Sequence, residues 1–496
     1  MADLKDLELL ILSRYPIIAV ETYEEERVEA VLQAVAAKLQ IPLFVWTVTD
    51  GLRRRDGNRD GAPIYDTQRS IMALANLASI KGDGVYLFKD LHRQLADAEV
   101  VRKLQDLTRL FAKARRAVVL SAPRIELPLE LEKLVALFRL ELPTTEELKR
   151  LATTVVDDLS RQHRIRVELG TADFDRLVDA MRGFTLFEAE RALTKVVLQD
   201  LALSLRDLDR MVELKKSLLE KDGVLQYFPP EEGLAQVGGL RSLKAWLDKR
   251  RKAFTPEASQ FGVSAPKGLL LLGVQGCGKT LAAKAVATEW GLPLLRLEPG
   301  RLFDKYVGES EKNLERALQV AERMAPCVLM VDEIEKGFAG VSGSEADGGV
   351  SRRIFGRLLG WLQERKAPVF VVATCNQIDS LPPEMMRKGR FDEIFFLDLP
   401  SAEERREIFG VHLTKRKRDP GKFDLGALAE AAEGFSGAEI EQAVVSALYT
   451  AFSGGRELET PTVLEELRAT RPLSVTRAEE IAGLRAWARD RTVPAS

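Results

Sequence analysis

Eight consecutive residues form the clearest chemical pattern in this chain of 496 residues. Residues 273–280, GVQGCGKT, fit the spacing G-x-x-x-x-G-K-[ST]. Glycines at these positions let the backbone curl so that its N–H groups point at phosphate oxygens, and the N-terminus of a following helix adds partial positive charge. Lys279 would then reach the β- and γ-phosphates of a nucleotide, and Thr280 would bind Mg²⁺. The pattern predicts a site for a nucleoside triphosphate with Mg²⁺.

Two adjacent carboxylates follow about fifty residues later, directly after the apolar run 328–331. A parallel strand buried on both faces is continuously apolar, so acids at its carboxyl end lie at the sheet edge where α/β proteins bind ligands. Asp332 suits the Mg²⁺ shell, and Glu333 suits the task of polarising an attacking water. Because these acids follow a phosphate-binding pattern, we interpret them as part of the same site.

The phosphate pattern requires a strand before it and a helix after it, and the sequence offers both. The apolar run 268–272 precedes the loop and a helical pattern over 281–289 follows it. Strand and helix patterns alternate over about 240–400 and again over about 17–120, which predicts an α/β fold with two mainly parallel sheets covered by helices. Residues 51–61 are predicted to be a solvated Arg/Gly/Asp loop.

Composition excludes several classes of protein. The chain has 73 basic and 75 acidic residues, a net charge of -2, so we expect no sequence-wide affinity for nucleic acid or anionic membranes. No stretch approaches the roughly 18 apolar residues of a membrane span. Three cysteines without CxxC spacing predict neither a disulfide framework nor a zinc site. A soluble protein of a reducing compartment, most simply the cytoplasm, is expected.

From about residue 236 to 490 the chain resembles the AAA ATPase family, in the subgroup that contains NSF and valosin-containing protein. The residues that carry the resemblance, besides the phosphate and Asp-Glu patterns, are the segments 237–240 (VGGL), 304–310 (DKYVGES), 373–376 (ATCN), 387–392 (RKGRFD) and 434–439 (GFSGAE). The resemblance implies a homo-hexameric ring that hydrolyses ATP with Mg²⁺ at each subunit interface.

The resemblance also assigns roles to residues. Asn376 would orient the lytic water or sense the γ-phosphate, and Arg387 and Arg390 would complete the site of the neighbouring subunit. Tyr306 and Val307 would grip a polypeptide in the central pore. The residues expected to contact the nucleotide are Gly238, Gly273, Gly276, Cys277, Gly278, Lys279, Thr280, Leu281, His412, Gly437 and Ala438; those expected to hold the metal are Thr280 and Asp332.

Simpler interpretations of some of these residues stay open. Tyr306 could pack on its own subunit, His412 could be a packing residue of a helix, and the two arginines could be ordinary surface residues. The first functional hypothesis is a ring that remodels or unfolds protein substrates, with the N-terminal half as adaptor or partner-binding domain. The alternative is a nucleotide-gated scaffold that threads nothing. A nucleic-acid motor is disfavoured by the charge balance.

The two halves of the chain show a repeat. Residues 183–193 parallel 434–444, and 142–147 parallel 399–404, so a common fold is the simplest account. The first copy lacks the phosphate-binding residues, because Arg27-Val28-Glu29 stand at about the positions that correspond to Gly278-Lys279-Thr280. We interpret the N-terminal half as a degenerate AAA-like domain that binds no nucleotide; an unrelated α/β adaptor is the alternative.

This arrangement is similar over the whole length to the AAA proteins of cyanobacteria and plastids called hypothetical chloroplast reading frame forty-six, which implies the plastid stroma if the protein is organellar. The predicted domains are a degenerate AAA-like domain over 1–147, a helical lid-like region over 148–228, an ATPase α/β subdomain over 229–400, and a helical lid with a C-terminal helix over 401–496.

Overall fold

The computed structural model describes residues 2–56, 59–220, 223–228, 237–302, 309–338, 350–378, 381–387 and 389–496. The chain divides into two compact units, Met1–Ser204 and Leu205–Ser496, called here the N-terminal unit and the C-terminal unit. Among the described residues, no helix is both long enough and apolar enough to cross a membrane.

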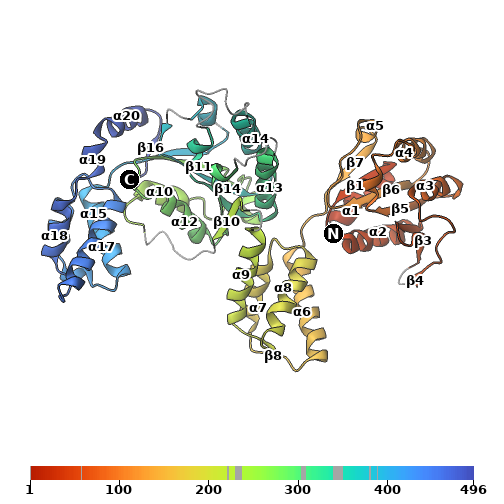
Figure 1. The fold of residues 1–496 in the computed structure, drawn as a ribbon, viewed down its shortest axis with the longest axis horizontal. Coiled ribbons are helices and arrows are strands. Elements are labelled where there is room, and N and C mark those ends of the chain that lie inside the picture. Colours follow the sequence, from red (N-terminus) through yellow and green to blue (C-terminus); the bar gives the residue numbers. More distant parts are fainter. Residues whose placement is uncertain are drawn as a thin grey trace. The chain divides into compact units, whose positions relative to one another are not determined.

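The N-terminal unit begins with alternating helices and strands and ends in a helical bundle (Figure 1). Its elements are α1 (Ala2–Leu12), β1 (Ile17–Glu21), α2 (Glu25–Leu39), β2 (Leu43–Thr47), β3 (Gly51–Asp56), β4 (Arg59–Asp60), α3 (Ser70–Ser79), β5 (Gly84–Lys89), α4 (Ala98–Phe111), β6 (Arg116–Ala122), α5 (Leu129–Glu132), β7 (Val135–Phe138), α6 (Thr145–Gln162), β8 (Arg166–Val167), α7 (Thr171–Met181), α8 (Leu186–Leu198) and β9 (Ala202–Leu203).

The main sheet of this unit has the strand order β4-β3-β2-β5-β6-β1-β7, and β2, β5, β6, β1 and β7 run parallel. Side chains alternate between the two faces of each strand. Ile18 packs with α1 and α2 on one face, whereas Ile17 and Ala19 pack in the core under α3 and α4 on the other. The continuous apolar strands are explained by this burial on both faces, as expected for a parallel sheet.

The prediction of a loop over 51–61 was wrong. Residues of β3 pair antiparallel with β2, so that Arg53 lies opposite Val45. A charged sequence can form a strand at a sheet edge, because one face of such a strand meets solvent. The arginines also have partners inside the unit: the Nε atom of Arg55 lies 2.5 Å from the carboxylate of Glu29.

The C-terminal unit has the same plan: an α/β part followed by helices. Its elements are α9 (Arg206–Leu219), β10 (Leu225–Phe228), α10 (Arg241–Asp248), α11 (Pro256–Gln260), β11 (Gly268–Gly273), α12 (Lys279–Trp290), β12 (Leu294–Leu297), α13 (Glu309–Arg323), β13 (Cys327–Val331), α14 (Val350–Glu364), β14 (Val369–Cys375), β15 (Glu393–Leu397), α15 (Ala402–Lys415), α16 (Leu425–Ala431), α17 (Gly437–Ser453), α18 (Thr460–Ala469), α19 (Leu473–Thr476), α20 (Ala478–Ala488) and β16 (Val493–Pro494).

The second sheet repeats the first. Its order is β10-β12-β13-β14-β11-β15-β16, so β12, β13, β14, β11 and β15 occupy the places of β2, β5, β6, β1 and β7. Helices α10 and α12 cover one face and α13 and α14 the other. The predicted fold class, a parallel-sheet α/β module with a helical lid preceded by an α/β domain with its own helices, is confirmed.

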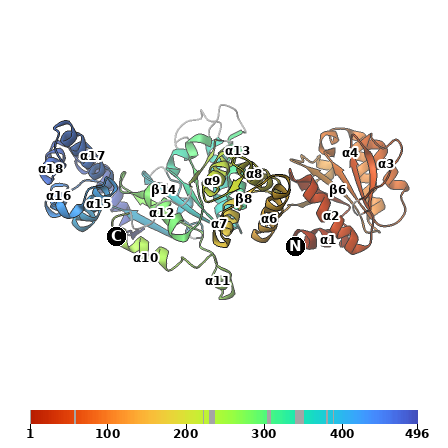
Figure 2. The same cartoon turned by 90° about the horizontal axis from the view of Figure 1, so that it is seen from below.

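Helices α15 to α18 form a separate small core (Figure 2). Two of them, α15 and α17, begin with the same local signals as α6 and α8 of the N-terminal unit. Thr144 and Ser401 cap α6 and α15, and Thr185 and Ser436 cap α8 and α17, each with a glutamate three residues on that bonds back. These are capping boxes, which satisfy orphan N–H groups at a helix start. They coincide with the repeat seen in the sequence.

Candidate nucleotide site

The phosphate loop, residues 274–278, joins the end of β11 to the start of α12. Gly276 and Gly278 have φ angles of 80° and 87°, a left-handed backbone that glycine adopts without the penalty of a Cβ atom. A Cβ atom at Gly276 would also meet the hydroxyl of Ser436 at 2.8 Å. Both glycines permit the curl of the loop, and Gly276 also permits the close approach of Ser436 at the start of α17.

Lys279 is the first residue of α12, and its ammonium group turns back onto the phosphate loop. The Nζ atom donates to the backbone oxygens of Gly273 and Val274, both at 2.8 Å. The residue is 6% exposed, and burial lowers the pKa of its ammonium group. A cation held at a helix N-terminus by neutral carbonyl groups is a suitable partner for phosphate oxygens.

The two predicted metal residues lie together. Asp332 follows β13 and is buried; its Oδ1 atom accepts from the hydroxyl of Thr374 at 2.7 Å and lies 3.3 Å from that of Thr280. Hydroxyl and carboxylate oxygens are the ligands that Mg²⁺ takes alongside nucleotide phosphates and water. The donor set therefore fits Mg²⁺, as the sequence predicts.

Arg296 of β12 is a residue of the site that the sequence analysis missed. Its Nη2 and Nε atoms lie 2.5 Å and 3.1 Å from Oδ2 of Asp332. The available signal was a single charged residue inside the apolar strand Leu294–Leu297. That signal shows that the residue is unusual, but its partner lies on the neighbouring strand and is not evident from the sequence.

Glu333 and Asn376 also meet, as expected for a pair that handles water. The Nδ2 atom of Asn376 donates to Oε1 of Glu333 at 3.2 Å, and the backbone N–H of Glu333 donates to the hydroxyl of Thr374 at 2.8 Å. Glu333 has a φ angle of 51°, which costs a residue with a Cβ atom about 1–2 kcal/mol. Such strain persists only where the surroundings hold it; Glu333 lines the pocket, and its Oε2 atom lies 2.5 Å from Nζ of Lys336.

These groups line one pocket of about 570 Å³ in the C-terminal unit. The predicted residues among its lining are Gly238, Gly276, Cys277, Gly278, Lys279, Thr280, Leu281, Asp332, Glu333, Asn376, His412, Gly437 and Ala438. As far as the described residues go, the lining leaves out Gly273, Arg387 and Arg390. Burial raises the pKa of the Cys277 thiol to about 12, so this cysteine is a packing residue rather than a nucleophile.

His412 of α15 enters the pocket from the helical side. Its Nδ1 atom is buried, lies 3.6 Å from Oε1 of Glu441, and makes no hydrogen bond to the described residues. Burial lowers the pKa of the imidazole, and Arg416 and Lys415 act in the same direction, against Glu441. A neutral imidazole with an orphaned nitrogen fits a contact with a base or ribose.

The remaining predicted residues lie elsewhere. Arg387 is exposed, whereas Arg390 is half-buried and donates from Nη1 to the backbone oxygen of Glu384. Tyr306 and Val307, the predicted pore residues, lie outside the described residues.

The N-terminal unit has no equivalent of the phosphate loop. Only three residues, 22–24, join β1 to α2, against the five of the phosphate loop, and the start of α2 sets Glu25 opposite Lys279. The predicted register set Val28 opposite Lys279, give or take one residue, and was therefore wrong, because the helix starts set Glu25 at that place. At the end of β5, Lys89 stands opposite Asp332 and lies 2.8 Å from Glu29. The sign of the charge is therefore reversed at both positions: Glu25 stands opposite Lys279, and Lys89 stands opposite Asp332.

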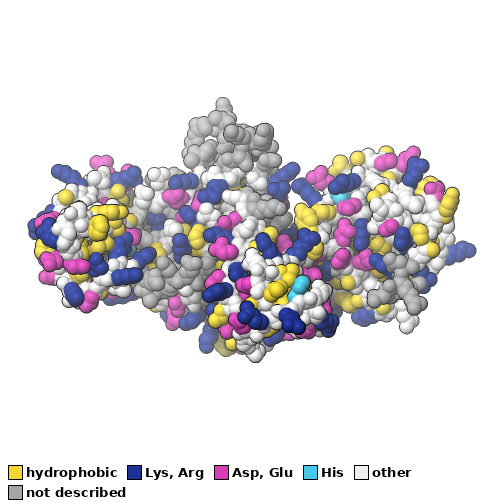
Figure 3. All heavy atoms as spheres, turned by 60° about the horizontal axis from the view of Figure 1, so that its bottom comes forward, with side chains coloured by type: hydrophobic (Ala, Val, Ile, Leu, Met, Phe, Trp, Pro, Cys, Tyr) yellow, Lys and Arg dark blue, Asp and Glu magenta, His cyan; other side chains and the backbone are white. Residues whose placement is uncertain are grey.

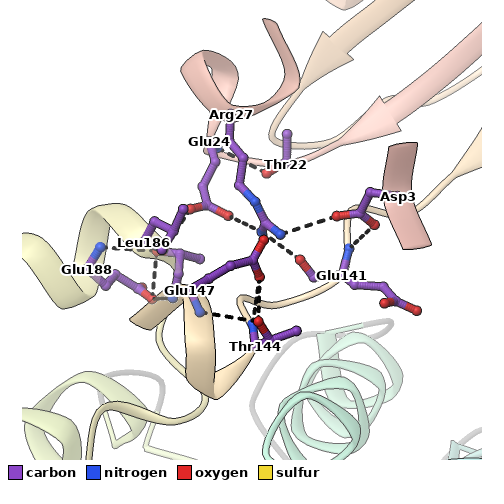
Figure 4. A network of polar contacts seen from close by, with 10 residues as sticks. Asp3, Thr22, Glu24, Arg27, Glu141, Thr144, Glu147, Leu186 and Glu188 are labelled. Carbon is purple, nitrogen blue, oxygen red and sulfur yellow. Dashed lines mark hydrogen bonds and ion pairs between the residues drawn. The ribbon is translucent and has the colours of Figure 1, made fainter. Parts of the chain in front are cut away.

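Side chains of the N-terminal unit form a polar network between the start of α2 and the helical bundle (Figure 4). Glu24 accepts from the backbone N–H of Leu186, at the start of α8, at 2.8 Å and pairs with Arg27 at 3.2 Å. Arg27 continues the network to Asp3 at 3.2 Å and to the backbone oxygen of Glu141 at 2.6 Å. This carboxylate and guanidinium join the α/β part to the helical bundle.

Comparisons with known proteins agree with this architecture. Four family models match in order: SpoVK-like AAA ATPase, N-terminal domain, over residues 3–140; SpoVK-like AAA ATPase, second domain, over 146–222; ATPase family associated with various cellular activities (AAA) over 269–399; and AAA+ lid domain over 422–466. An uncharacterized AAA domain-containing protein ycf46 of Pyropia yezoensis is 36% identical over 490 residues, covering 98% of this chain and 97% of that protein.

The chain belongs to the AAA ATPase family. Its relatives include ycf46 proteins that match along nearly the whole chain; that of Guillardia theta is 38% identical over 490 residues, covering 98% of this chain and 95% of its own. Other AAA members match in part. A proteasome-activating nucleotidase of Sulfurisphaera tokodaii is 35% identical over 221 residues, which are 42% of this chain and 55% of that protein.

Proposed function

We propose that this AAA protein hydrolyses ATP at the pocket of the C-terminal unit and uses the energy to remodel or unfold proteins. The observation that carries the proposal is the convergence of Lys279 with Asp332 and Glu333. Two separate segments supply these groups: the phosphate loop with the start of α12 supplies a phosphate-binding cation, and the end of β13 supplies a metal carboxylate and a candidate base within the same pocket. A cluster of ion pairs that only stabilised the fold would not require a glutamate with a strained backbone next to a glycine loop.

Each residue has a distinct role in this proposal. Lys279 and the N–H groups of the phosphate loop bind the β- and γ-phosphates, and Thr280 and Asp332 hold Mg²⁺, which neutralises phosphate charge when bound. Glu333 accepts a proton from the attacking water, and Asn376 orients the Glu333 carboxylate through the bond between them. His412, Gly437 and Ala438 are placed to contact the base and ribose.

The proposal includes a homo-hexameric ring. Arg387 and Arg390 do not line the pocket of their own chain, as far as the described residues go, so their proposed action is on a neighbour. An arginine supplied in this way stabilises charge on the transferred phosphoryl group and accelerates the reaction by about 10³–10⁵, or roughly 4–7 kcal/mol.

Protein is the proposed substrate. In the AAA family the aromatic residue at the position of Tyr306 grips polypeptide, and some relatives are named proteasome-activating nucleotidases. On the face drawn in Figure 3, basic and acidic side chains lie interspersed, whereas a nucleic-acid motor would gather its basic residues along a stripe.

The N-terminal unit is proposed to serve as a partner-binding domain without nucleotide. Its support is the reversed charge at Glu25 and Lys89 and the hydrogen bond that joins Glu24 to Leu186. The proposed domains are residues 1–147, 148–228, 229–400 and 401–496.

The test is phosphate release by the purified full chain, with an unfolded protein or single-stranded DNA added in parallel. Stimulation by the protein alone supports the proposal, and stimulation by DNA alone contradicts it. Tyr306→Ala should keep substantial basal hydrolysis but lose work on the protein. If Tyr306→Ala processes the protein as well as the wild type does, the alternative of a nucleotide-gated scaffold is favoured.

A further inference from the structure

Arg296 occupies an unexpected place for a charged residue. It belongs to β12, which runs parallel to β13 and antiparallel to β10 and whose other residues, Leu294, Leu295 and Leu297, are buried apolar side chains. A charge in such a strand costs desolvation energy unless it is paired. The Arg296 side chain is 26% exposed and faces the same pocket as the phosphate loop.

The guanidinium joins two carboxylates. It approaches Oδ2 of Asp332 through both Nη2 and Nε, at 2.5 Å and 3.1 Å, while Nη1 lies 3.0 Å from Glu298. The other oxygen of Asp332 accepts from Thr374 at 2.7 Å. Both oxygens of Asp332 are thus held by side chains of this chain, and its negative charge is balanced without a metal ion.

This balance matters for nucleotide binding. An unpaired Asp332 beside the phosphate loop would repel the β- and γ-phosphates and so add to the negative charge that Lys279 and Mg²⁺ must offset. Because Arg296 already offsets the charge, nucleotide can enter before, or without, the metal. The planar guanidinium also restricts the Asp332 side chain to one rotamer, so the metal ligand is ordered in advance.

We propose that Arg296 is a positioning residue for Asp332: it orders and neutralises this carboxylate in the absence of Mg²⁺ and so permits metal-free nucleotide binding. This inference rests on the proposed nucleotide site but is separable from it. It concerns how strongly affinity depends on the metal, whereas the proposed function concerns whether nucleotide binds and reacts at all.

The test compares the affinity of the full chain for a fluorescent ADP analogue in Mg²⁺ and in EDTA. The quantity of interest is the ratio of the Kd in EDTA to the Kd in Mg²⁺. Arg296→Gln should raise this ratio about tenfold over wild type, chiefly by weakening binding in EDTA. Arg301→Gln is the matched control, because Arg301 pairs with the same Glu298, at 2.6 Å, but does not line the pocket. It should leave the ratio unchanged.

Arg296→Lys keeps the charge but loses the fork geometry, so its ratio should fall between those of wild type and Arg296→Gln. If Arg296→Gln does not fold, Arg296→Lys against Arg301→Lys carries the same comparison. In an Asp332→Asn background, Arg296→Gln should not weaken binding in EDTA further, since the repelling charge is gone.

Two outcomes distinguish a failure of the proposed nucleotide site from a failure of the inference about Arg296. If the wild type binds no nucleotide under either condition, the proposed site is wrong. If the wild type and Arg301→Gln bind nucleotide but Arg296→Gln only lowers the Tm and leaves the ratio unchanged, Arg296 is a structural residue of the sheet and the inference is overturned.

Discussion

Glu24 and Leu186 are joined by a hydrogen bond of 2.8 Å from the backbone N–H of Leu186 to the Glu24 carboxylate. The C-terminal unit has a related contact, in which the backbone N–H of Ala438 donates to the backbone oxygen of Gly276 at 3.1 Å. In both units the loop after a central strand meets the start of a capped helix of the helical part. In the N-terminal unit, however, the side-chain carboxylate of Glu24 makes the contact. The chain itself therefore supplies an anion at the N-terminus of α8.

The first prediction concerns this contact. Glu24→Ala should lower the free energy of unfolding of the N-terminal unit by about 1–3 kcal/mol, because Arg27 and the start of α8 both lose a buried partner. Glu24→Gln should cost less, since its amide oxygen can still accept from Leu186. Chemical denaturation of the full chain measures the change, with Glu26→Gln on the exposed side of α2 as control. Equal stability of Glu24→Ala and the control would contradict a role for this contact.

The second prediction concerns stoichiometry. Each chain should bind one non-hydrolysable ATP analogue, and Lys279→Ala should bind almost none, because the N-terminal unit presents Glu25 where the C-terminal unit presents Lys279. Titration calorimetry counts the sites. Two nucleotides per wild-type chain, or one remaining in Lys279→Ala at comparable affinity, would show that the N-terminal unit binds nucleotide after all.

The third prediction separates binding from chemistry. Glu333→Gln should bind ATP with near wild-type affinity but hydrolyse it at least about 10²-fold more slowly, because the amide cannot accept the proton of water. Equilibrium binding and phosphate release are measured on the same preparation, and Glu364→Gln, at the end of α14, serves as a control glutamate. Wild-type turnover by Glu333→Gln would rule out this residue as the base.

The fourth prediction concerns the shared interface. Arg387→Ala and Arg390→Ala should each bind ATP but lose about 10³-fold or more in hydrolysis. Mixing either variant with Lys279→Ala should restore some activity, since certain interfaces then pair an intact site with an intact arginine. Phosphate release is followed after subunit exchange has been verified. If no mixture regains activity, the arginines do not act in trans.

The fifth prediction concerns pH. The folded-state pKa of His412 is lowered, with burial as the main cause, so the unfolded chain takes up the proton at a higher pH than the folded one. This histidine therefore makes the C-terminal unit lose stability as the pH falls below about 6.5, down to the folded-state pKa. His412→Gln should flatten this part of the profile. Denaturation at several pH values between about 7.5 and 5 measures it, and parallel curves for the two proteins would contradict the assignment.

Local sequence determined much of this protein. The phosphate loop and the start of α12 were predictable because their backbone geometry depends on neighbouring residues: glycines that permit positive φ angles, then a helix N-terminus. The repeat was predictable for the same reason, since each capping box lies within four residues, as at Thr185 and Ser436. The carboxylates Asp332 and Glu333 followed from an apolar strand and the rule that α/β ligands bind at its carboxyl end.

Only the tertiary structure decided which distant residues meet. Arg55 of β3 meets Glu29 of α2, Arg296 of β12 meets Asp332 at the end of the neighbouring strand, and Glu24 meets Leu186 of the helical bundle. Residues 51–61 were predicted to form a loop. Residues 51–56 form β3 instead, because their backbone hydrogen bonds to β2 outweigh a polar composition. The periodicity of a sequence indicates which face of a helix or strand is apolar. It does not indicate which residue of another element pairs with a buried charged side chain.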